Sequence, residues 1–194
     1  MKNFKSDNKI GQEGQNTLED FFSSLKDRGV ITGFCNTEHF VFLHLGLDYE
    51  CDYVLWKKAP NRWSPPQTWG AECKSVAGSG KDKRTGELIV YDTTVIEAWQ
   101  DDAKTKRPGW YKAAKEGKLD YIYIENRYQG RIYCYDAKEL LDFVDNTLQD
   151  WNLTRCWQSG DDRGWIFRFN WMSKQHGFKS YFHKVNGRWA KSTV

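Results

Sequence analysis

Two short apolar runs that carry charged residues at alternating positions constrain this sequence more than any other feature. They are residues 51–56 (CDYVLW) and residues 71–75 (AECKS). Because side chains of a β-strand point to alternate faces, Glu72 and Lys74 share one face of the second run. A turn-rich segment joins the two runs, as in a hairpin. If the run that contains Asp52 pairs beside the second run, two carboxylates and one amine converge.

These three side chains suit metal-assisted phosphodiester hydrolysis. Carboxylate oxygens are good ligands for hard cations such as Mg²⁺, and a nearby lysine orients or deprotonates water or offsets phosphate charge. The alternative is a solvated Glu72–Lys74 ion pair, because E-x-K is a short pattern. The Asp52 run, about twenty residues earlier, favours the catalytic interpretation. Asp48 and Glu50 share the parity of Asp52 and remain open as supplementary ligands.

The rest of the chain predicts a mixed α/β fold. Apolar residues recur every three or four positions over residues 11–28, which predicts a helix that ends at Gly29, after a loose start over residues 1–10. A short strand over 30–34 and an apolar, β-rich run over 38–47 follow. We predict further strands over 69–76, 87–91, 120–125, 131–135, 165–171 and 179–185, and helices over 93–104, 110–116 and 136–151.

The order of helix, strand, strand with Asp, strand with Glu-x-Lys, helix and strand resembles the PD-(D/E)XK nuclease superfamily. Residues 51–55 match its P-D-apolar element, with Cys51 where the family often has proline, and residues 72–74 match its (D/E)-x-K element. The resemblance covers roughly residues 11–135. It implies a restriction-endonuclease-like α/β (α+β) core, with a mixed central β-sheet flanked by helices (αβββαβ). We assign this core to residues 1–150, and residues 151–194 to an aromatic, basic, β-rich extension packed on or next to it.

The resemblance also implies a nuclease that uses Mg²⁺ or Mn²⁺. Together with the basic carboxyl-terminal segment, the Asp52, Glu72 and Lys74 set leads us to expect hydrolysis of phosphodiester bonds in DNA, by an endonuclease in preference to an exonuclease. Asp52 and Glu72 would bind the metal, with the backbone carbonyl of Cys73 as a further candidate ligand. Lys74 would position or activate the attacking water. Many members of the superfamily add a Glu or Gln from the first helix. The candidates for that position in this chain are Glu13, Gln15 and Glu19.

Positive charge is concentrated towards the carboxyl end. The formal net charge is +3, whereas residues 163–194 contain seven basic residues and no acidic residue. This asymmetry predicts contact with a polyanion, and the alternative is a solvated tail. A basic, glycine-rich loop at 78–86 lacks P-loop spacing and is either a substrate clamp or a hairpin tip. The candidate nucleic-acid contacts are Lys81, Lys83, Arg84, Arg168, Lys179, Lys184 and Arg188.

Other features narrow the class of protein. The chain has an odd number of cysteines, five, and no two of them form a C-x-x-C pair. We therefore expect reduced thiols and no zinc site. No signal peptide or membrane-spanning run is recognisable, which favours the cytoplasm, or the host cytoplasm if a phage encodes the protein. The alternatives to a DNA nuclease are a non-catalytic nucleic-acid-binding protein of the same fold and a junction-specific or RNA nuclease. The basic segment could instead be a homodimer interface, and phage or mobile-element DNA processing is a context suggested by analogy.

Overall fold

A mixed β-sheet of seven strands forms the centre of the computed structural model, which describes residues 4–37, 51–91, 93–99, 106, 109–147, 156–159, 162–168 and 178–192. Its strands are β1 (Gly33–Asn36), β2 (Tyr53–Lys57), β3 (Gln67–Val76), β7 (Tyr121–Asn126), β8 (Arg131–Asp136), β11 (Phe178–Val185) and β12 (Arg188–Ser192). They lie in the order β1-β2-β3-β7-β8-β11-β12. The pair β3–β7 is parallel and the other pairs are antiparallel.

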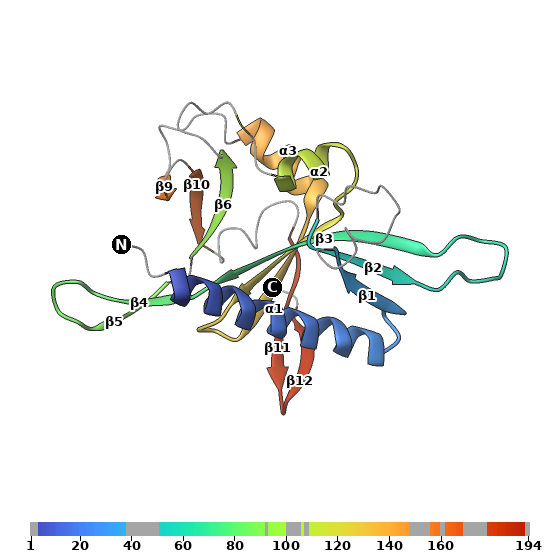
Figure 1. Cartoon of the computed structure of the whole chain (residues 1–194), viewed down its shortest axis with the longest axis horizontal. Helices are drawn as coiled ribbons and strands as arrows, with labels where there is room; N and C mark the ends of the chain where they lie inside the picture. Colours follow the sequence, from blue (N-terminus) through green and yellow to red (C-terminus); the bar gives the residue numbers. More distant parts are fainter. Residues whose placement is uncertain are drawn as a thin grey trace.

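Helices cover both faces of this sheet. Helix α1 (Phe4–Asp27) lies on one face, and α2 (Gly109–Lys115) and α3 (Ala137–Thr147) lie on the other (Figure 1). The mixed α/β class with a helix-flanked sheet is therefore confirmed. The described helices include none that is both long and apolar enough to cross a membrane.

The stripe predicted on the first helix is buried on the sheet. Leu18, Phe21, Phe22 and Leu25 are all buried and form one cluster with residues of β2, β3, β7 and β8. The Phe22 ring meets the Tyr123 ring edge-on, with 5.2 Å between centroids. Burial of such side chains contributes about 1.5–3 kcal/mol each, so this stripe fixes which face of α1 meets the sheet.

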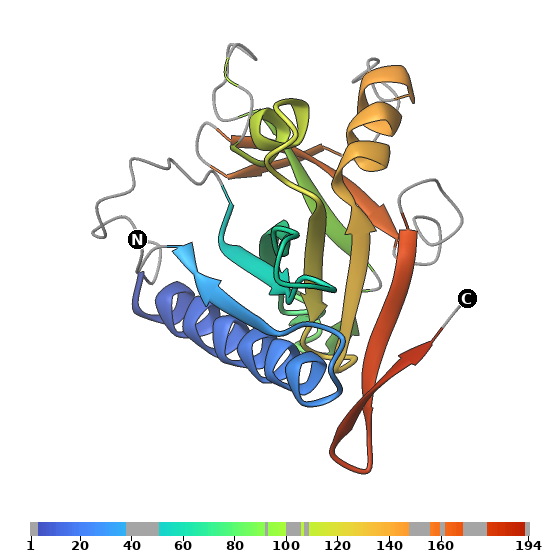
Figure 2. The same cartoon turned by 90° about the vertical axis from the view of Figure 1, so that its right-hand side faces the viewer.

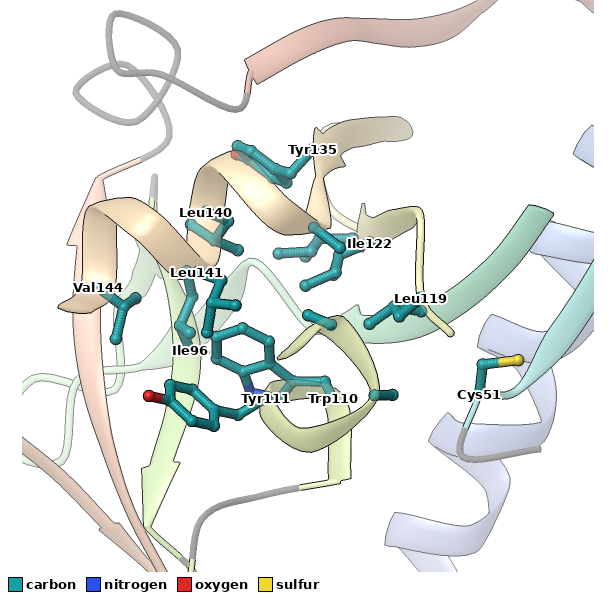
Figure 3. Close-up of a cluster of buried hydrophobic side chains, with 14 of the residues drawn as sticks. Cys51, Ile96, Trp110, Tyr111, Leu119, Ile122, Tyr135, Leu140, Leu141 and Val144 are labelled. Carbon is teal, nitrogen blue, oxygen red and sulfur yellow. The ribbon is translucent and has the colours of Figure 1, made fainter. Parts of the chain in front are cut away.

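A second cluster of buried side chains lies between the opposite sheet face and the other two helices. Figure 3 shows Trp110 of α2 and Leu140 of α3 packed around Ile122 of β7. The side chain of Asp136 accepts a hydrogen bond from the Glu139 amide at 3.0 Å and so caps α3. The predicted hairpin at 120–135 and the start of the helix after it are confirmed.

Three strands and one hairpin lie outside the main sheet. The strands β6 (Thr93–Trp99), β10 (Asp162–Arg168) and β9 (Cys156–Ser159) form a small antiparallel sheet in that order. The strands β4 (Ser79–Lys81) and β5 (Leu88–Val90) form a hairpin that projects from the body (Figure 1). The chain thus passes through β4, β5, β6 and α2 between the parallel strands β3 and β7.

The last two strands join the sheet and reach back to the first helix (Figure 2). Strand β11 pairs with β8, and the predicted turn at 186–187 has positive φ at both residues. Buried Trp189 packs edge-on against Phe21, with ring centroids 5.5 Å apart, and its Nε1 donates to Asp20 at 2.9 Å. Part of the 151–194 segment therefore completes the central sheet and the core beneath α1.

Several sequence predictions are wrong. Residues 93–99 form β6 rather than a helix, because β-branched residues Thr93 to Ile96 favour an extended backbone and pair with β10. The first helix already begins at Phe4, the strand predicted at 30–34 begins at Gly33, and the strand predicted at 165–171 lies at 162–168. The apolar run at 38–47, with Asp48 and Glu50, lies outside the described residues.

Candidate active site

Pairing of β2 with β3 brings the two acidic positions side by side. The last pair of the antiparallel ladder is Tyr53 with Ala71, and Asp52 and Glu72 are the residues that come directly after this pair on the two chains. The backbone amide of Cys73 donates to Oδ2 of Asp52 at 2.8 Å. This hydrogen bond fixes the Asp52 carboxylate against the middle of β3.

Glu72 and Lys74 form a close ion pair on one face of β3. Their Oε1 and Nζ atoms are 2.8 Å apart, and the two side chains are 10% and 38% exposed. In the parallel register they pair with Ile122 and Ile124 of β7, which belong to the cluster under α2 and α3. A carboxylate this buried needs a counter-charge, and the Lys74 ammonium provides it while keeping partial access to solvent.

Burial and the carboxylates of this site raise the pKa values of two thiols, Cys51 and Cys73. Burial, opposed by a hydrogen bond from Ala71 and reinforced by the negative charges of Asp52 and Glu72, raises the pKa of Cys51 to about 11. The pKa of Cys73 is raised well above its usual range, first by burial and then by the same two carboxylates. Both thiols therefore stay protonated at neutral pH. The side chain of Cys73 is a poor metal ligand in that state, which leaves its carbonyl as the group to consider.

The first-helix candidates meet the sheet elsewhere. The Tyr53 hydroxyl donates to Oε1 of Glu19 at 2.9 Å, and burial together with this bond raises the pKa of Tyr53. Tyr53 and its partner Ala71 face α1, so Glu72, the next residue on β3, faces away from that helix. Gln15 is half-buried one turn before Glu19. The structure thus does not bring Glu19 to the face that holds Glu72 and Lys74.

Glu13 also serves a different contact. Its carboxylate forms an ion pair with Arg127, which follows β7. The contact ties the amino-terminal half of α1 to the turn between β7 and β8. Of the five acidic or amide candidates, the structure therefore brings Asp52 and Glu72 together and gives Glu13 and Glu19 separate partners.

Glu125 is a buried carboxylate that sequence reasoning did not select. It is 5% exposed on β7 and accepts a hydrogen bond from the Ser75 hydroxyl at 2.7 Å. Gly14 of α1 lies directly over this pair, where a Cβ atom would come within 2.5 Å of Cβ of Ser75. The acidic end of the run DYIYIE was a signal, but only the register of β3 with β7 shows that Ser75 is its partner.

The basic candidates lie on two parts of the chain, the β4–β5 hairpin and the carboxyl-terminal strands. Lys81, Lys83 and Arg84 are exposed on the β4–β5 hairpin. Asp82 shapes the tip of that hairpin by accepting the amides of Thr85 and Arg84, and these hydrogen bonds lower the pKa of Asp82. The hairpin therefore presents three cations away from the body, as a phosphate contact requires.

The carboxyl-terminal cations differ from one another in their contacts. Lys184 pairs with Asp20, with Nζ and Oδ2 2.8 Å apart, and its ammonium lies 5.1 Å from the centre of the Trp189 ring. Arg188 is exposed beside a pocket of about 590 Å³ that two aspartates, Asp20 and Asp27, also line. Arg168 and Lys179 lie on β10 and β11, and their side chains lie outside the described part of the structure. The charge of Lys184 is thus offset within the protein.

The donor set limits which metal would fit. Within the part of the chain that the structure describes, no three His, Cys, Asp or Glu side chains are arranged to hold an ion. Asp52 and Glu72 supply a pair of carboxylates instead. Mg²⁺ often binds through one or two carboxylates, with water and substrate phosphate completing its shell, so this pair fits Mg²⁺ better than a metal that needs a full protein cage.

Comparison with known proteins adds no relative to this picture. A scan against protein-family models, a search of curated proteins and a search of solved structures each found no match to this chain.

Proposed function

We propose that the protein is a divalent-metal-dependent nuclease that hydrolyses phosphodiester bonds in DNA, with a core of the restriction-endonuclease-like kind. One observation carries the proposal. Asp52 directly precedes β2, and its carboxylate accepts a hydrogen bond from the Cys73 amide, next to Glu72 on β3. Lys74 forms an ion pair with Glu72. Two carboxylates and an ammonium at one point of a rigid sheet are the groups that such hydrolysis uses.

Each residue has a distinct role in this proposal. Asp52 and Glu72 would hold Mg²⁺ or Mn²⁺, which when bound supplies a Lewis acid to the phosphate and lowers the pKa of water. Lys74, whose side chain is 38% exposed, orients a water molecule or a phosphate oxygen through its ammonium. The Cys73 amide keeps the Asp52 carboxylate in place. The order of elements supports the family resemblance, with β4, β5 and β6 as additions before the crossover helix α2.

The test is DNA cleavage with and without Mg²⁺. Plasmid, linear duplex, single-stranded DNA and a four-way junction serve as DNA substrates, with a single-stranded RNA in parallel, and products are separated on gels. We expect cleavage only with Mg²⁺ or Mn²⁺, and loss of cleavage in Asp52→Asn and Glu72→Gln. The Asn side chain still offers an oxygen to the Cys73 amide, so Asp52→Asn removes charge while keeping this contact.

The chain offers a matched control for these variants. Glu116 and Lys118 form a second E-x-K ion pair, 2.6 Å apart, in which both side chains are about half exposed. Glu116→Gln should cleave DNA like the wild type, because this pair is solvated and lies outside the site. Full metal-dependent cleavage by Asp52→Asn or Glu72→Gln would exclude the assigned roles, whatever the control does.

A nucleic-acid-binding protein without catalysis is the second candidate. The observation that favours it is the 2.8 Å Glu72–Lys74 pair, which neutralises the buried carboxylate with no metal. Under this alternative, wild type binds DNA equally well with Mg²⁺ and with EDTA, and cuts none of the DNA or RNA substrates. Cleavage of RNA alone, or of the junction alone, would instead identify the substrate within the nuclease proposal.

A further inference from the structure

The connection between β2 and β3 forms an arm that carries charge of one sign. We define the β2–β3 arm as residues 57–67. It contains three cations (Lys57, Lys58 and Arg62) and no acidic residue, and three of the four prolines of the chain. Figure 1 shows it extending beyond the body of the protein, at the end opposite the β4–β5 hairpin. A cationic arm without acidic residues of its own is complementary to a polyanion.

One large aromatic side chain stands at the tip of this arm. Trp63 is 81% exposed, the highest value among the large exposed hydrophobic residues in the described part of the chain. The guanidinium of Arg62 lies 4.5 Å from the centre of its ring. The indole belongs to neither core cluster, so its surface is available to a partner outside the chain.

The loop around Trp63 is held in one conformation. The side chain of Asn61 accepts the amides of Trp63 and Ser64 at 2.9 and 3.1 Å. Prolines at 60, 65 and 66 restrict the backbone on both sides. A preformed loop loses little entropy when its aromatic ring is covered, so binding through Trp63 would retain most of the contact energy.

We propose that Trp63 stacks on an unpaired base of a DNA strand while the cations of the β2–β3 arm contact its phosphates. This proposal rests on the proposed function for the identity of the polymer. Aromatic side chains bind bases of any sequence because every base has a π-face, and neighbouring cations supply affinity for the backbone. Arg62 lies against the indole and offers its charge to the same nucleotide.

The strands set the distance between this contact and the candidate active site. Five residue steps separate Glu72 from Gln67, the last residue of the arm, which corresponds to about 17 Å at the rise of a β-strand. Trp63 lies beyond that point. For a strand whose bases stay stacked at about 3.4 Å per nucleotide, about 17 Å corresponds to about five nucleotides between the phosphate at Glu72 and the start of the arm. The inference therefore predicts a contact with the strand well outside the cleavage position.

Binding measured in EDTA tests the inference without any need for cleavage. The probes are a fluorescently labelled dT 20-mer and a 20-mer of the same charge made of abasic residues, titrated with the full-length protein. Stacking by one aromatic residue corresponds to about a 5- to 150-fold loss of affinity for Trp63→Ala on the dT probe. Trp63→Phe should retain most of the affinity, and both variants should match wild type on the abasic probe.

Controls separate stacking from charge and from misfolding. Tyr128→Ala removes an aromatic side chain that is 49% exposed on another turn, and it should bind like wild type. Trp63→Ala should leave the salt dependence of binding unchanged, whereas Arg62→Gln should lower its slope by about one. Equal affinity of wild type and Trp63→Ala for dT would overturn the proposal. So would an equal loss on the abasic probe, or a Trp63-dependent affinity found only for phosphatidylserine vesicles. If the expected binding pattern is found but nuclease activity is absent, the proposed function is refuted and the stacking proposal stands.

Discussion

Helix α1 lies very close to β3 at Gly14. We therefore predict that Gly→Ala lowers the free energy of unfolding at Gly14 and raises it at Gly11. Gly11 and Gly14 both lie within α1. An added Cβ at Gly11 would meet no atom within 4 Å, whereas one at Gly14 would lie 2.5 Å from Cβ of Ser75 and 2.8 Å from its Oγ. The Ser75 Cβ is fixed to the β3 backbone, so rotation of a side chain cannot relieve the overlap.

The magnitudes follow from helix propensity and packing. Gly→Ala in an exposed helix interior stabilises by up to about 1 kcal/mol, so Gly11→Ala should raise the free energy of unfolding by that amount. Gly14→Ala gains the same propensity but adds an overpacking cost of about 3 kcal/mol, at the upper end because α1 itself must move. The net effect is a loss of about 2 kcal/mol. In a chain of this size these changes correspond to about +2–4 °C and −4–8 °C in Tm.

Urea titrations followed by tryptophan fluorescence and thermal melts followed by circular dichroism measure both variants. A double variant, Gly14→Ala with Ser75→Gly, removes the atoms that clash, and it should recover part of the loss despite its unpaired Glu125 carboxylate. The reasoning would be refuted if Gly14→Ala were as stable as Gly11→Ala, since α1 would then not lie against Ser75.

Two further predictions concern titration. The pKa of Cys51 is raised to about 11, so alkylation of Cys51 by iodoacetamide, followed by mass spectrometry, should be slow at pH 8 and rise about tenfold per pH unit up to that value. A rate at pH 8 equal to that of a free thiol would contradict this burial. The hydrogen bond from Lys184, followed by that from Trp189, lowers the pKa of Asp20. Its contribution to stability is therefore present above the ordinary pKa of 3.8 and is lost as the pH falls through the folded value. The difference in unfolding free energy between wild type and Asp20→Asn should shrink from pH 6 to pH 3, and a constant difference would argue against the contact.

The elements that the sequence predicts well are those whose signals are local. The predicted hairpin at 120–135 has a dense β-branched and aromatic pattern with a glycine turn, and Asp136 provides a helix cap within three residues of its partner. The pairing of β2 with β3 could also be anticipated, because alternation fixes a face and a turn-rich segment joins the two runs. Such signals require no knowledge of distant parts of the chain.

Other features depend on partners far away in sequence. Val95, Ile96 and Trp99 fit a helical stripe as well as a strand, and the decision comes from β10, whose Ile166 pairs with Val95. The face of the sheet that Glu19 meets follows from how α1 docks, with Tyr53 thirty-four residues away as its partner. The sequence around Val95 does not indicate its pairing with β10, and the sequence around Glu19 does not indicate its contact with Tyr53.

At the candidate site, the E-x-K pattern also cannot be interpreted from local sequence alone. It occurs at 72–74 and again at 116–118, each time as a close ion pair. The glutamate is 10% exposed in the first pair and 51% exposed in the second. The first pair is distinguished as a candidate active site by Asp52, whose carboxylate accepts the amide of Cys73, the residue between Glu72 and Lys74.

The position of Trp189 beneath α1 has a consequence for synthesis on the ribosome. Asp20 and Trp189, which share a hydrogen bond, are 169 residues apart. At a synthesis rate of about 5–20 residues per second, Trp189 is made roughly 10–30 s after α1, so α1 lacks this core residue during that interval. During that interval Phe21 lacks both Phe182 and Trp189 as neighbours. We therefore expect the nascent helix to be the segment of this protein that most depends on holding chaperones, and slower translation to prolong that dependence.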